Sequence, residues 1–193
     1  MPVARAACAR KYLARLRETL TEKRLSHCIF TAEYLSSYAE SIGVDHDEAV
    51  AAGLLHDICR DMTKSELLAS ARELRLPISE EQLAKPVLLH GPVAAEKCRV
   101  EFGISDDVYE AVYWHTTGRP GLGLLGQGLC LADFAEPTRK YPEAAEARGR
   151  LRKNGFANAI LYVAEMGIEF GKRQEVADPN ATAFYLWLKG KQA

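Results

Sequence analysis

The sequence contains two adjacent histidine–aspartate pairs, His46-Asp47 and His56-Asp57, whose surroundings differ. The first pair lies in GVDHDEA, a polar segment that indicates an exposed helix start. The second pair lies near the end of AVAAGLLHDIC, which is apolar on all sides, as a buried helix should be. An ionised carboxylate buried without a partner costs several kcal/mol. The sequence therefore predicts that a cation compensates Asp57.

Three further histidines and one further aspartate have similarly apolar neighbours, namely His27, His90, His115 and Asp133. Each alone is compatible with a hydrogen-bonded core residue. Together with the buried pair they predict one shared site, because helical bundles place ligands on facing helices. The donors are nitrogen and oxygen only, which favours Fe, Mn, Zn, Co or Mg over thiolate-bound metals. Four ligands suffice for one metal, and six leave room for a second or for His90 and His115 to act on substrate.

Four arginines lie close in sequence to these candidate ligands. Arg24 precedes His27 by three positions, and Arg60 follows Asp57 by three. Arg119 lies in a Gly/Pro-rich loop after the fourth candidate histidine, and Arg139 follows the second candidate aspartate. Guanidinium groups suit phosphate oxygens, so the set indicates an anionic substrate.

Helix signals dominate the chain and predict an all-α fold. Apolar residues recur at three- and four-residue spacing from about Ala6 to Ser41, and Gly43 ends that stretch. Residues 116–123 (TTGRPGLG) should form a loop, and the polar residues 139–154 should be exposed. The other expected helices cover about 45–59, 64–74 after a Thr63 cap, 91–102, 106–115 after a Ser105 cap, 124–136, 155–170 and a last segment after Pro179.

Length and composition suit one globular domain over residues 1–193. The net charge of -1 gives no support to general binding of nucleic acid or membrane surfaces. The five cysteines are odd in number and widely spaced, which favours reduced thiols over disulfides or a thiolate zinc site. Without a signal-like or bilayer-length apolar run, the protein is expected to be cytoplasmic.

The segments LLHDICRD, LLHGPVAA, HTTGRPG and LADFAEPTR carry a family resemblance. Their order resembles that of the HD superfamily of metal phosphohydrolases, and most closely the YqeK-type symmetrical bis(5′-nucleosyl)-tetraphosphatases. The resemblance covers about Arg24 to Arg139 and implies a compact helical HD-domain bundle. It also implies iron as cofactor and cleavage of diadenosine tetraphosphate into two ADP.

Carried over by motif, the resemblance implies roles for particular residues. The metal ligands would be His27, His56, Asp57 and Asp133. Of these ligands, His27, Asp57 and Asp133 would also contact the nucleotide, together with Arg24, Arg60, His90, His115, Thr116, Arg119 and Arg139. Asp57, His90 and His115 would be catalytic, with Asp57 orienting a metal-activated water and the histidines and arginines balancing charge on the polyphosphate.

The chain departs from the family pattern at Ser26, where relatives commonly have Glu, and over the C-terminal segment 155–193, where DPNATAFYLWL has no Arg-Asn pair. The second departure leaves the preference for a nucleotide base open. The aromatic C-terminal helix (Phe184, Tyr185, Trp187) should pack on its own domain, and the chain is expected to be a monomer or a homodimer.

Three alternatives stay open from the residues alone. The chain could be an HD-domain nucleotidase or polyphosphohydrolase acting on mononucleotides, with the same metal ligands. It could be a catalytically inactive nucleotide-sensing HD domain. It could also be a structural helical protein whose core histidines are merely hydrogen-bonded.

Overall fold

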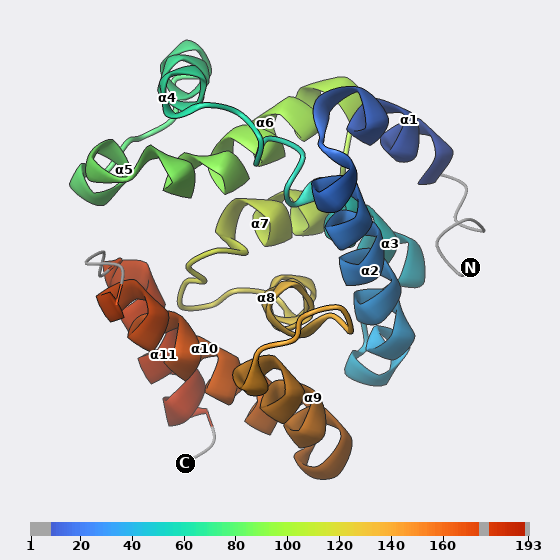
Figure 1. The fold of residues 1–193 in the computed structure, drawn as a ribbon. Coiled ribbons are helices and arrows are strands. Elements are labelled where there is room, and N and C mark those ends of the chain that lie inside the picture. Colours follow the sequence, from blue (N-terminus) through green and yellow to red (C-terminus); the bar gives the residue numbers. More distant parts are fainter. Residues whose placement is uncertain (1–8, 174–177, 192–193) are drawn as a thin grey trace.

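The computed structural model describes residues 9–173 and 178–191, and these form α-helices joined by turns and loops, without a strand (Figure 1). The all-α prediction is confirmed. The predicted helix start at Ala6 and the thiol of Cys8 lie outside the described residues. The helices are α1 (Ala9–Thr19), α2 (Glu22–Tyr38), α3 (His46–Leu55), α4 (Lys64–Glu73), α5 (Glu80–Ala84), α6 (His90–Phe102), α7 (Asp106–Trp114), α8 (Leu124–Ala135), α9 (Pro142–Asn154), α10 (Phe156–Arg173) and α11 (Pro179–Gly190). Short 3₁₀ turns lie at Glu40–Ile42 and Pro86–Leu89.

The continuous helical stretch predicted from Ala6 to Ser41 is wrong, because the chain breaks between α1 and α2. Thr21 has extended backbone angles there, and its N–H and hydroxyl donate to Asp61 Oδ2 at 2.8 and 2.9 Å. The partner comes from the turn that follows α3, so a tertiary contact fixes the break. Apolar spacing along the chain carries no signal of such a contact.

Helix starts with a capping side chain were predicted well. Thr63 Oγ1 accepts from the N–H of Glu66, and the N–H of Thr63 donates to the Glu66 carboxylate, which together form a capping box at the start of α4. Ser105 accepts from the N–H of Val108 at the start of α7. Local hydrogen bonding fixes these boundaries, so local sequence suffices to find them.

Residues 139–154 were predicted to be exposed, and most of their side chains are exposed or half-buried, but the segment also has a buried stripe. Helix α9 occupies its greater part, and Ala144 and Ala147 are buried against the neighbouring helices α8 and α10. The buried stripe consists of alanines among charged residues. The mean polarity of the segment therefore conceals a packed face.

Helices α7 and α8 lie in the middle of the molecule, with α2 and α3 on one side and α10 and α11 on the other (Figure 1). The pair α2–α3 packs very closely, because Gly53 of α3 faces Ala32 of α2 and a Cβ on Gly53 would overlap the Ala32 backbone. This close approach brings the end of α3 against the side of α2, which positions the candidate site.

The C-terminal helices α10 and α11 pack against the preceding helices. Helix α10 packs on α8 and α9, and α11 packs on α10 with Phe184 and Leu188 buried. The expected packing of the aromatic C-terminal helix on its own domain is confirmed for Phe184.

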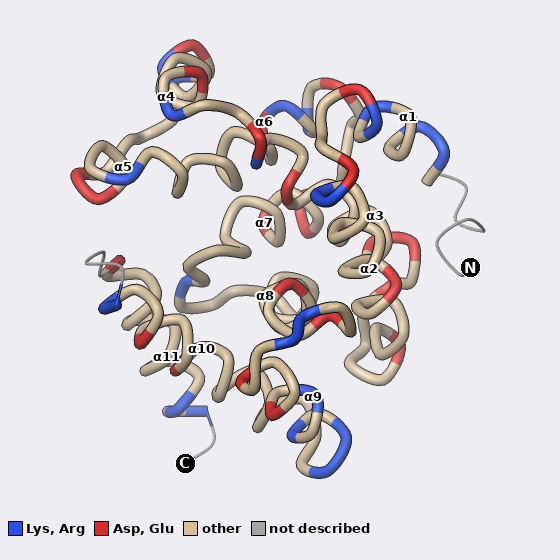
Figure 2. Tube along the Cα trace, viewed as in Figure 1, with Lys and Arg blue, Asp and Glu red and all other residues tan. Residues whose placement is uncertain are grey.

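Basic and acidic residues are interspersed along the described helices, in keeping with the near-neutral net charge (Figure 2). The four described cysteines (Cys28, Cys59, Cys98 and Cys130) are buried free thiols. No helix in the described ranges combines the length and the apolar composition that crossing a membrane requires.

Candidate metal centre

The His56-Asp57 pair lies in the turn that directly follows α3. His56 closes the helix through its backbone N–H, and both side chains are buried, with residue exposures of 0% and 3%. The His46-Asp47 pair begins the same helix and is exposed, as predicted. The apolar helix therefore delivers one imidazole and one carboxylate into the interior.

Six candidate residues from five parts of the chain converge on this turn. Helix α2, the turn itself, the start of α6, the residue after α7, and α8 each contribute. We call this group the histidine–aspartate cluster; it consists of His27, His56, Asp57, His90, His115 and Asp133. Three overlapping subsets have ligand atoms close enough to share a cation, within 4.8 Å of one another.

Asp57 lies between two groups of imidazoles. Its Oδ2 faces Nε2 of His27 at 3.9 Å and Nε2 of His56 at 3.7 Å. Its Oδ1 faces Nε2 of His90 at 3.1 Å and Nε2 of His115 at 3.8 Å. One carboxylate thus connects both halves of the cluster.

Asp133 completes the first half of the cluster. Its Oδ1 lies 2.9 Å from Nε2 of His27 and 3.8 Å from Nε2 of His56. Each of the two aspartates therefore faces both His27 and His56. The assignment of these four residues as metal ligands stays a prediction.

Three of the imidazoles are oriented in the same way. Nδ1 of His56 contacts the carbonyl oxygen of Gly53 at 2.9 Å, and Nδ1 of His115 contacts that of Val112 at 2.8 Å. His90 makes the equivalent contact three residues back, at 2.5 Å. A carbonyl oxygen can only accept, so each Nδ1 carries the proton and donates it. Each Nε2 of a neutral ring then directs its lone pair toward the cluster.

These lone pairs fit a cation. Nε2 of His56 is buried and has no hydrogen-bond partner among the described residues. Nε2 of His90 and Nε2 of His115 lie 3.0 Å apart, so two lone pairs would face each other unless a proton or a cation intervened. Unsatisfied buried acceptors are destabilising, and a bound metal would satisfy them.

Ionisation of the two aspartates agrees with this fit. Burial would raise the pKa of Asp57, but the facing imidazoles of His56 and His90 hold that pKa far below its usual range. Burial likewise opposes ionisation of Asp133, and the hydrogen bond with His27 and the nearby His56 imidazole lower its pKa. Burial lowers the pKa of His115 to about 3. The cluster thus offers two carboxylates and a neutral imidazole at neutral pH.

His27 differs from the other imidazoles because its Nδ1 faces a carboxylate. Glu136 Oε1 lies 3.4 Å from that nitrogen, and Glu136 is itself only 1% exposed. Thr138 fixes this carboxylate by donating its N–H at 2.6 Å and its hydroxyl at 2.5 Å. Burial would lower the pKa of His27, but hydrogen bonds with Asp133 and Glu136 raise it to about 9.

Glu136 was not among the predicted site residues. It lies inside the segment LADFAEPTR, directly before Pro137, where the chain leaves α8. Its position in that segment was the only available signal, because a glutamate beside a helix end is usually exposed.

Two of the four predicted arginines contact the cluster. Nη1 of Arg24 lies 2.6 Å from Asp57 Oδ2, and Nη2 of Arg139 lies 3.0 Å from Asp133 Oδ1. Arg60 is half-buried in the turn after Asp57, and its side chain makes no ion pair with a described residue.

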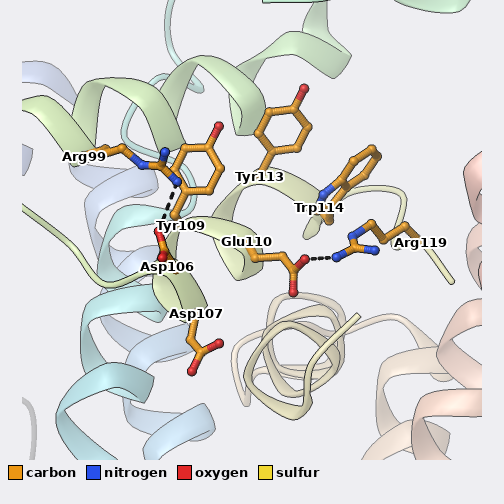
Figure 3. Close-up of a pocket in the computed structure, with 8 residues that line it drawn as sticks. All are labelled: Arg99, Asp106, Asp107, Tyr109, Glu110, Tyr113, Trp114 and Arg119. Carbon is orange, nitrogen blue, oxygen red and sulfur yellow. Dashed lines mark hydrogen bonds and ion pairs between the residues drawn. The ribbon is translucent and has the colours of Figure 1, made fainter. Parts of the chain in front are cut away.

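Arg119 lies elsewhere. It forms an ion pair with Glu110 of α7 and lines a separate hollow with Tyr113 and Trp114 (Figure 3). The same hollow contains the guanidinium of Arg99, which stacks on a tyrosine ring of α7. In the described structure Arg119 therefore does not share the hollow that adjoins the cluster.

A second hollow of about 550 Å³ opens directly from the cluster. Its polar end contains His115, Thr116, Asp133 and Arg139. Thr116 Oγ1 lies 3.2 Å from Nε2 of His115. Its other end is formed by α10 and α11, and we call the whole space the C-terminal hollow.

Comparison with known proteins places this arrangement in a family. The HD domain family model matches residues 24–176. A curated protein of Halalkalibacterium halodurans named symmetrical bis(5′-nucleosyl)-tetraphosphatase is 36% identical over 91% of this chain and 94% of its own length. A Bacillus subtilis protein of the same name is 30% identical, over 91% of this chain and 95% of that protein.

A solved structure has the same fold. The crystal structure of a protein from Clostridium acetobutylicum, described as a predicted HD superfamily hydrolase involved in NAD metabolism, matches with a TM-score of 0.88 and 25% identity. The match covers 94% of this chain and 97% of that one. The resemblance stated from the motifs is thereby confirmed: this chain belongs to the HD domain family and, within it, to the family of the symmetrical bis(5′-nucleosyl)-tetraphosphatases.

Proposed function

We propose that this protein is a metal-dependent hydrolase that cleaves diadenosine tetraphosphate symmetrically into two ADP. The observation that carries the proposal is the buried histidine–aspartate cluster, in which His56, His90 and His115 direct Nε2 inward and one Nε2 has no hydrogen-bond partner among the described residues. The names of the relatives, which cover nearly the whole chain, support the choice of substrate.

The metal would be held by His27, His56, Asp57 and Asp133, whose facing donor atoms lie 2.9 to 3.9 Å apart. Nitrogen and oxygen donors suit iron, our first choice from the family, and also Mn, Co, Zn or Mg. One metal is proposed, and Asp57 with His90 and His115 offers a second group of ligand atoms. A bound cation supplies a water with lowered pKa as the nucleophile.

Asp57, His90 and His115 are proposed as the catalytic residues. Oδ1 of Asp57 faces the two imidazoles and can accept a hydrogen bond that orients the attacking water. Because the Nδ1 protons are held by backbone carbonyls, the inward Nε2 atoms of neutral rings are acceptors. His90 and His115 are therefore proposed to accept protons during the reaction. The arginines are proposed to balance most of the negative charge of the polyphosphate.

The polyphosphate is proposed to bind where guanidinium groups border the cluster. Arg24 and Arg139 already contact its two aspartates, and Thr116 adds a hydroxyl at the same edge. Such preorganised positive charge stabilises developing charge on transferred phosphoryl groups. Arg60 remains a predicted phosphate contact, and Arg119 could become one only by leaving Glu110.

We also propose that residues 1–193 form a single HD domain. The family match at residues 24–176 extends beyond the motif-bearing core 24–139 into α10. Helices α8, α9 and α10 pack on one another, which supports treating the C-terminal segment as part of that domain.

The test is a product assay with purified protein on diadenosine tetraphosphate, supplied separately with Fe²⁺, Mn²⁺, Co²⁺ or Mg²⁺. ADP should be the sole nucleotide product with at least one metal. Equal amounts of ATP and AMP would indicate asymmetric cleavage, and release of phosphate from mononucleotides would favour a nucleotidase. Metal-independent binding without any turnover would contradict the proposed activity and favour a sensing domain.

A further inference from the structure

The segment where the chain leaves α8 carries three residues of the candidate site, and we call it the 133–139 turn. Asp133 lies in the last turn of α8, Glu136 directly follows the helix, and Arg139 lies three positions further on. Glu136 contacts the outer nitrogen of His27, and Arg139 contacts Asp133. The conformation of this turn therefore places a metal-ligand candidate, the carboxylate behind a second one, and a predicted phosphate contact.

The end of α8 has backbone carbonyl oxygens that need donors from outside the helix, because the last four carbonyls of an α-helix have no partner within it. The carbonyl of Asp133 accepts from Nε of Arg139 at 3.1 Å. The carbonyl of Phe134 accepts from the hydroxyl of Tyr141. The last carbonyl of the helix, that of Ala135, accepts from a residue of α9.

That residue is Arg148, whose guanidinium spans the turn. Its Nη1 donates to the carbonyl oxygens of Ala135 at 3.0 Å and Glu136 at 3.3 Å. The same group reaches the carbonyl oxygen of Arg139, from Nη1 at 3.4 Å and from Nη2 at 3.5 Å. A positive charge at this place also suits the C-terminal end of a helix. One planar group with several donors therefore joins the two sides of the 133–139 turn.

Helix α9 fixes the position of Arg148. The preceding Ala147 and, one turn earlier, Ala144 are buried where α9 packs on its neighbours α8 and α10. Arg148 is half-buried, and it forms no ion pair with a carboxylate of the described residues. Its hydrogen bonds in the described structure go to backbone carbonyls of the turn. The cation is thus directed at the backbone that carries the site residues.

We propose that Arg148 is a positioning residue of the metal centre. By joining both sides of the 133–139 turn, it holds Asp133 toward its histidines, Glu136 behind His27, and Arg139 beside Asp133. None of its described hydrogen bonds reaches a side chain of the histidine–aspartate cluster, so it acts through the backbone. This inference rests on the proposed metal site, and it does not depend on the identity of the substrate.

The direction of the effect on metal affinity separates positioning from charge. Arg148 is a cation, so charge alone predicts that its removal leaves the binding of a metal cation stronger or unchanged. Loss of positioning predicts weaker binding, because Asp133 and the carboxylate that orients His27 are no longer held in place.

The test uses Arg148→Met, which keeps an unbranched side chain that favours helix but removes the donors. Arg150→Met is the matched control, because Arg150 is also half-buried on α9 but pairs with Glu146 at 2.8 Å and stacks on the ring of Tyr162. Competition with a chromogenic chelator gives the affinity for Co²⁺, and the absorption spectrum of bound Co²⁺ reports its ligands. Arg148→Met should weaken Co²⁺ binding by roughly tenfold and change the spectrum, and Arg150→Met should do neither.

A second variant covers the case in which Arg148→Met does not fold. Arg148→Lys keeps the positive charge at the end of α8 but lacks the planar fork, so the fold should be kept. Its Co²⁺ binding should still weaken by roughly threefold. Melting temperatures and circular dichroism check the folding of each variant.

Hydrogen exchange of the metal-free protein measures the turn without any metal. The N–H of Thr138 donates to the Glu136 carboxylate, and the N–H of Arg139 donates to the Glu136 carbonyl. Both amides should exchange roughly tenfold faster in Arg148→Met, while those of α2 and α3 keep the parent rates. Faster exchange spread evenly over all helices would reduce Arg148 to a residue of general stability and overturn the proposal.

The metal measurements can overturn it as well. Unchanged or tighter Co²⁺ binding in both Arg148 variants would do so, and so would a parent protein that binds no Co²⁺. If Co²⁺ affinity falls as expected while the parent fails to cleave diadenosine tetraphosphate, the proposed activity fails and the positioning role of Arg148 stands.

Discussion

The two ends of α3 carry the same dipeptide with opposite outcomes. At its start, His46 and Asp47 have side-chain exposures of 49% and 60%, and His46 Nδ1 lies 3.4 Å from Asp47 Oδ1. Just beyond its end, the side chains of His56 and Asp57 are 0% and 5% exposed and meet residues from several other helices. A His-Asp dipeptide therefore does not identify a candidate metal site by itself. Burial against partners from several helices distinguishes the second pair from the first.

The difference comes from how α3 is placed. Its N-terminus lies at the surface with Asp45 as a cap, while Gly53 brings its C-terminal end tightly against α2. The same close packing that stabilises the core therefore delivers the second pair to the cluster. Substitutions at equivalent positions of the two pairs test this interpretation.

The largest effect is expected from the two aspartates. Asp57→Asn keeps the shape of the side chain but removes the charge that faces both halves of the cluster, and activity should fall by roughly a hundredfold or more. Asp47→Asn should stay within about twofold of the parent. Initial rates of ADP formation at saturating metal measure both. Equal activities of the two variants would refute the distinction between the pairs.

Metal-dependent stability gives the next comparison. Metal at a hundred times its Kd should raise the free energy of unfolding by about 2.7 kcal/mol in the parent and in His46→Ala, since it binds only the folded chain. His56→Ala removes a buried Nε2 that has no hydrogen-bond partner in the described part of the chain, and this variant should lose most of that gain. Denaturant unfolding with Mn²⁺ and with chelator tests this. A full gain in His56→Ala would exclude His56 as a ligand.

The cluster around the buried pair also includes a histidine whose outward ring nitrogen contacts a carboxylate, and the exposed pair has no such neighbour among the described residues. Glu136 accepts from Nδ1 of His27, and Glu136→Gln should weaken metal binding by about 10- to 100-fold, the scale for residues that orient metal-bound histidines. Glu146→Gln, on the exposed side of α9, is the matched control. Competition with a chromogenic chelator gives the affinities without reliance on turnover. An unchanged affinity in Glu136→Gln would limit Glu136 to packing.

Apolar surroundings were enough to predict which histidines and aspartates come together, because burying such groups requires partners. Their roles in binding and catalysis remain predictions. Local hydrogen bonds made the caps at Thr63 and Ser105 predictable as well. In each case the signal lies within a few residues of the feature it predicts.

Features that depend on distant partners could not be predicted. The break before Thr21 is held by Asp61, forty positions away, and Arg119 is held by Glu110 of another element. The buried carboxylate of Glu136 contacts the His27 ring, which lies more than a hundred residues earlier in the chain. Neither periodicity nor composition records such pairs.

The smallest effect concerns the structural task of the exposed end of α3. Asp45 accepts from the N–H of Glu48 at 2.9 Å, so Asp45→Ala should lower the free energy of unfolding by about 1 kcal/mol. Asp45→Asn keeps an acceptor and should recover most of that loss, while ADP formation stays unchanged in both variants. Urea unfolding and the rate assay measure the two quantities. A loss of activity in Asp45→Ala without a loss of stability would mean that the start of α3 also communicates with the cluster, and the division of α3 into a structural end and a chemical end would then fail.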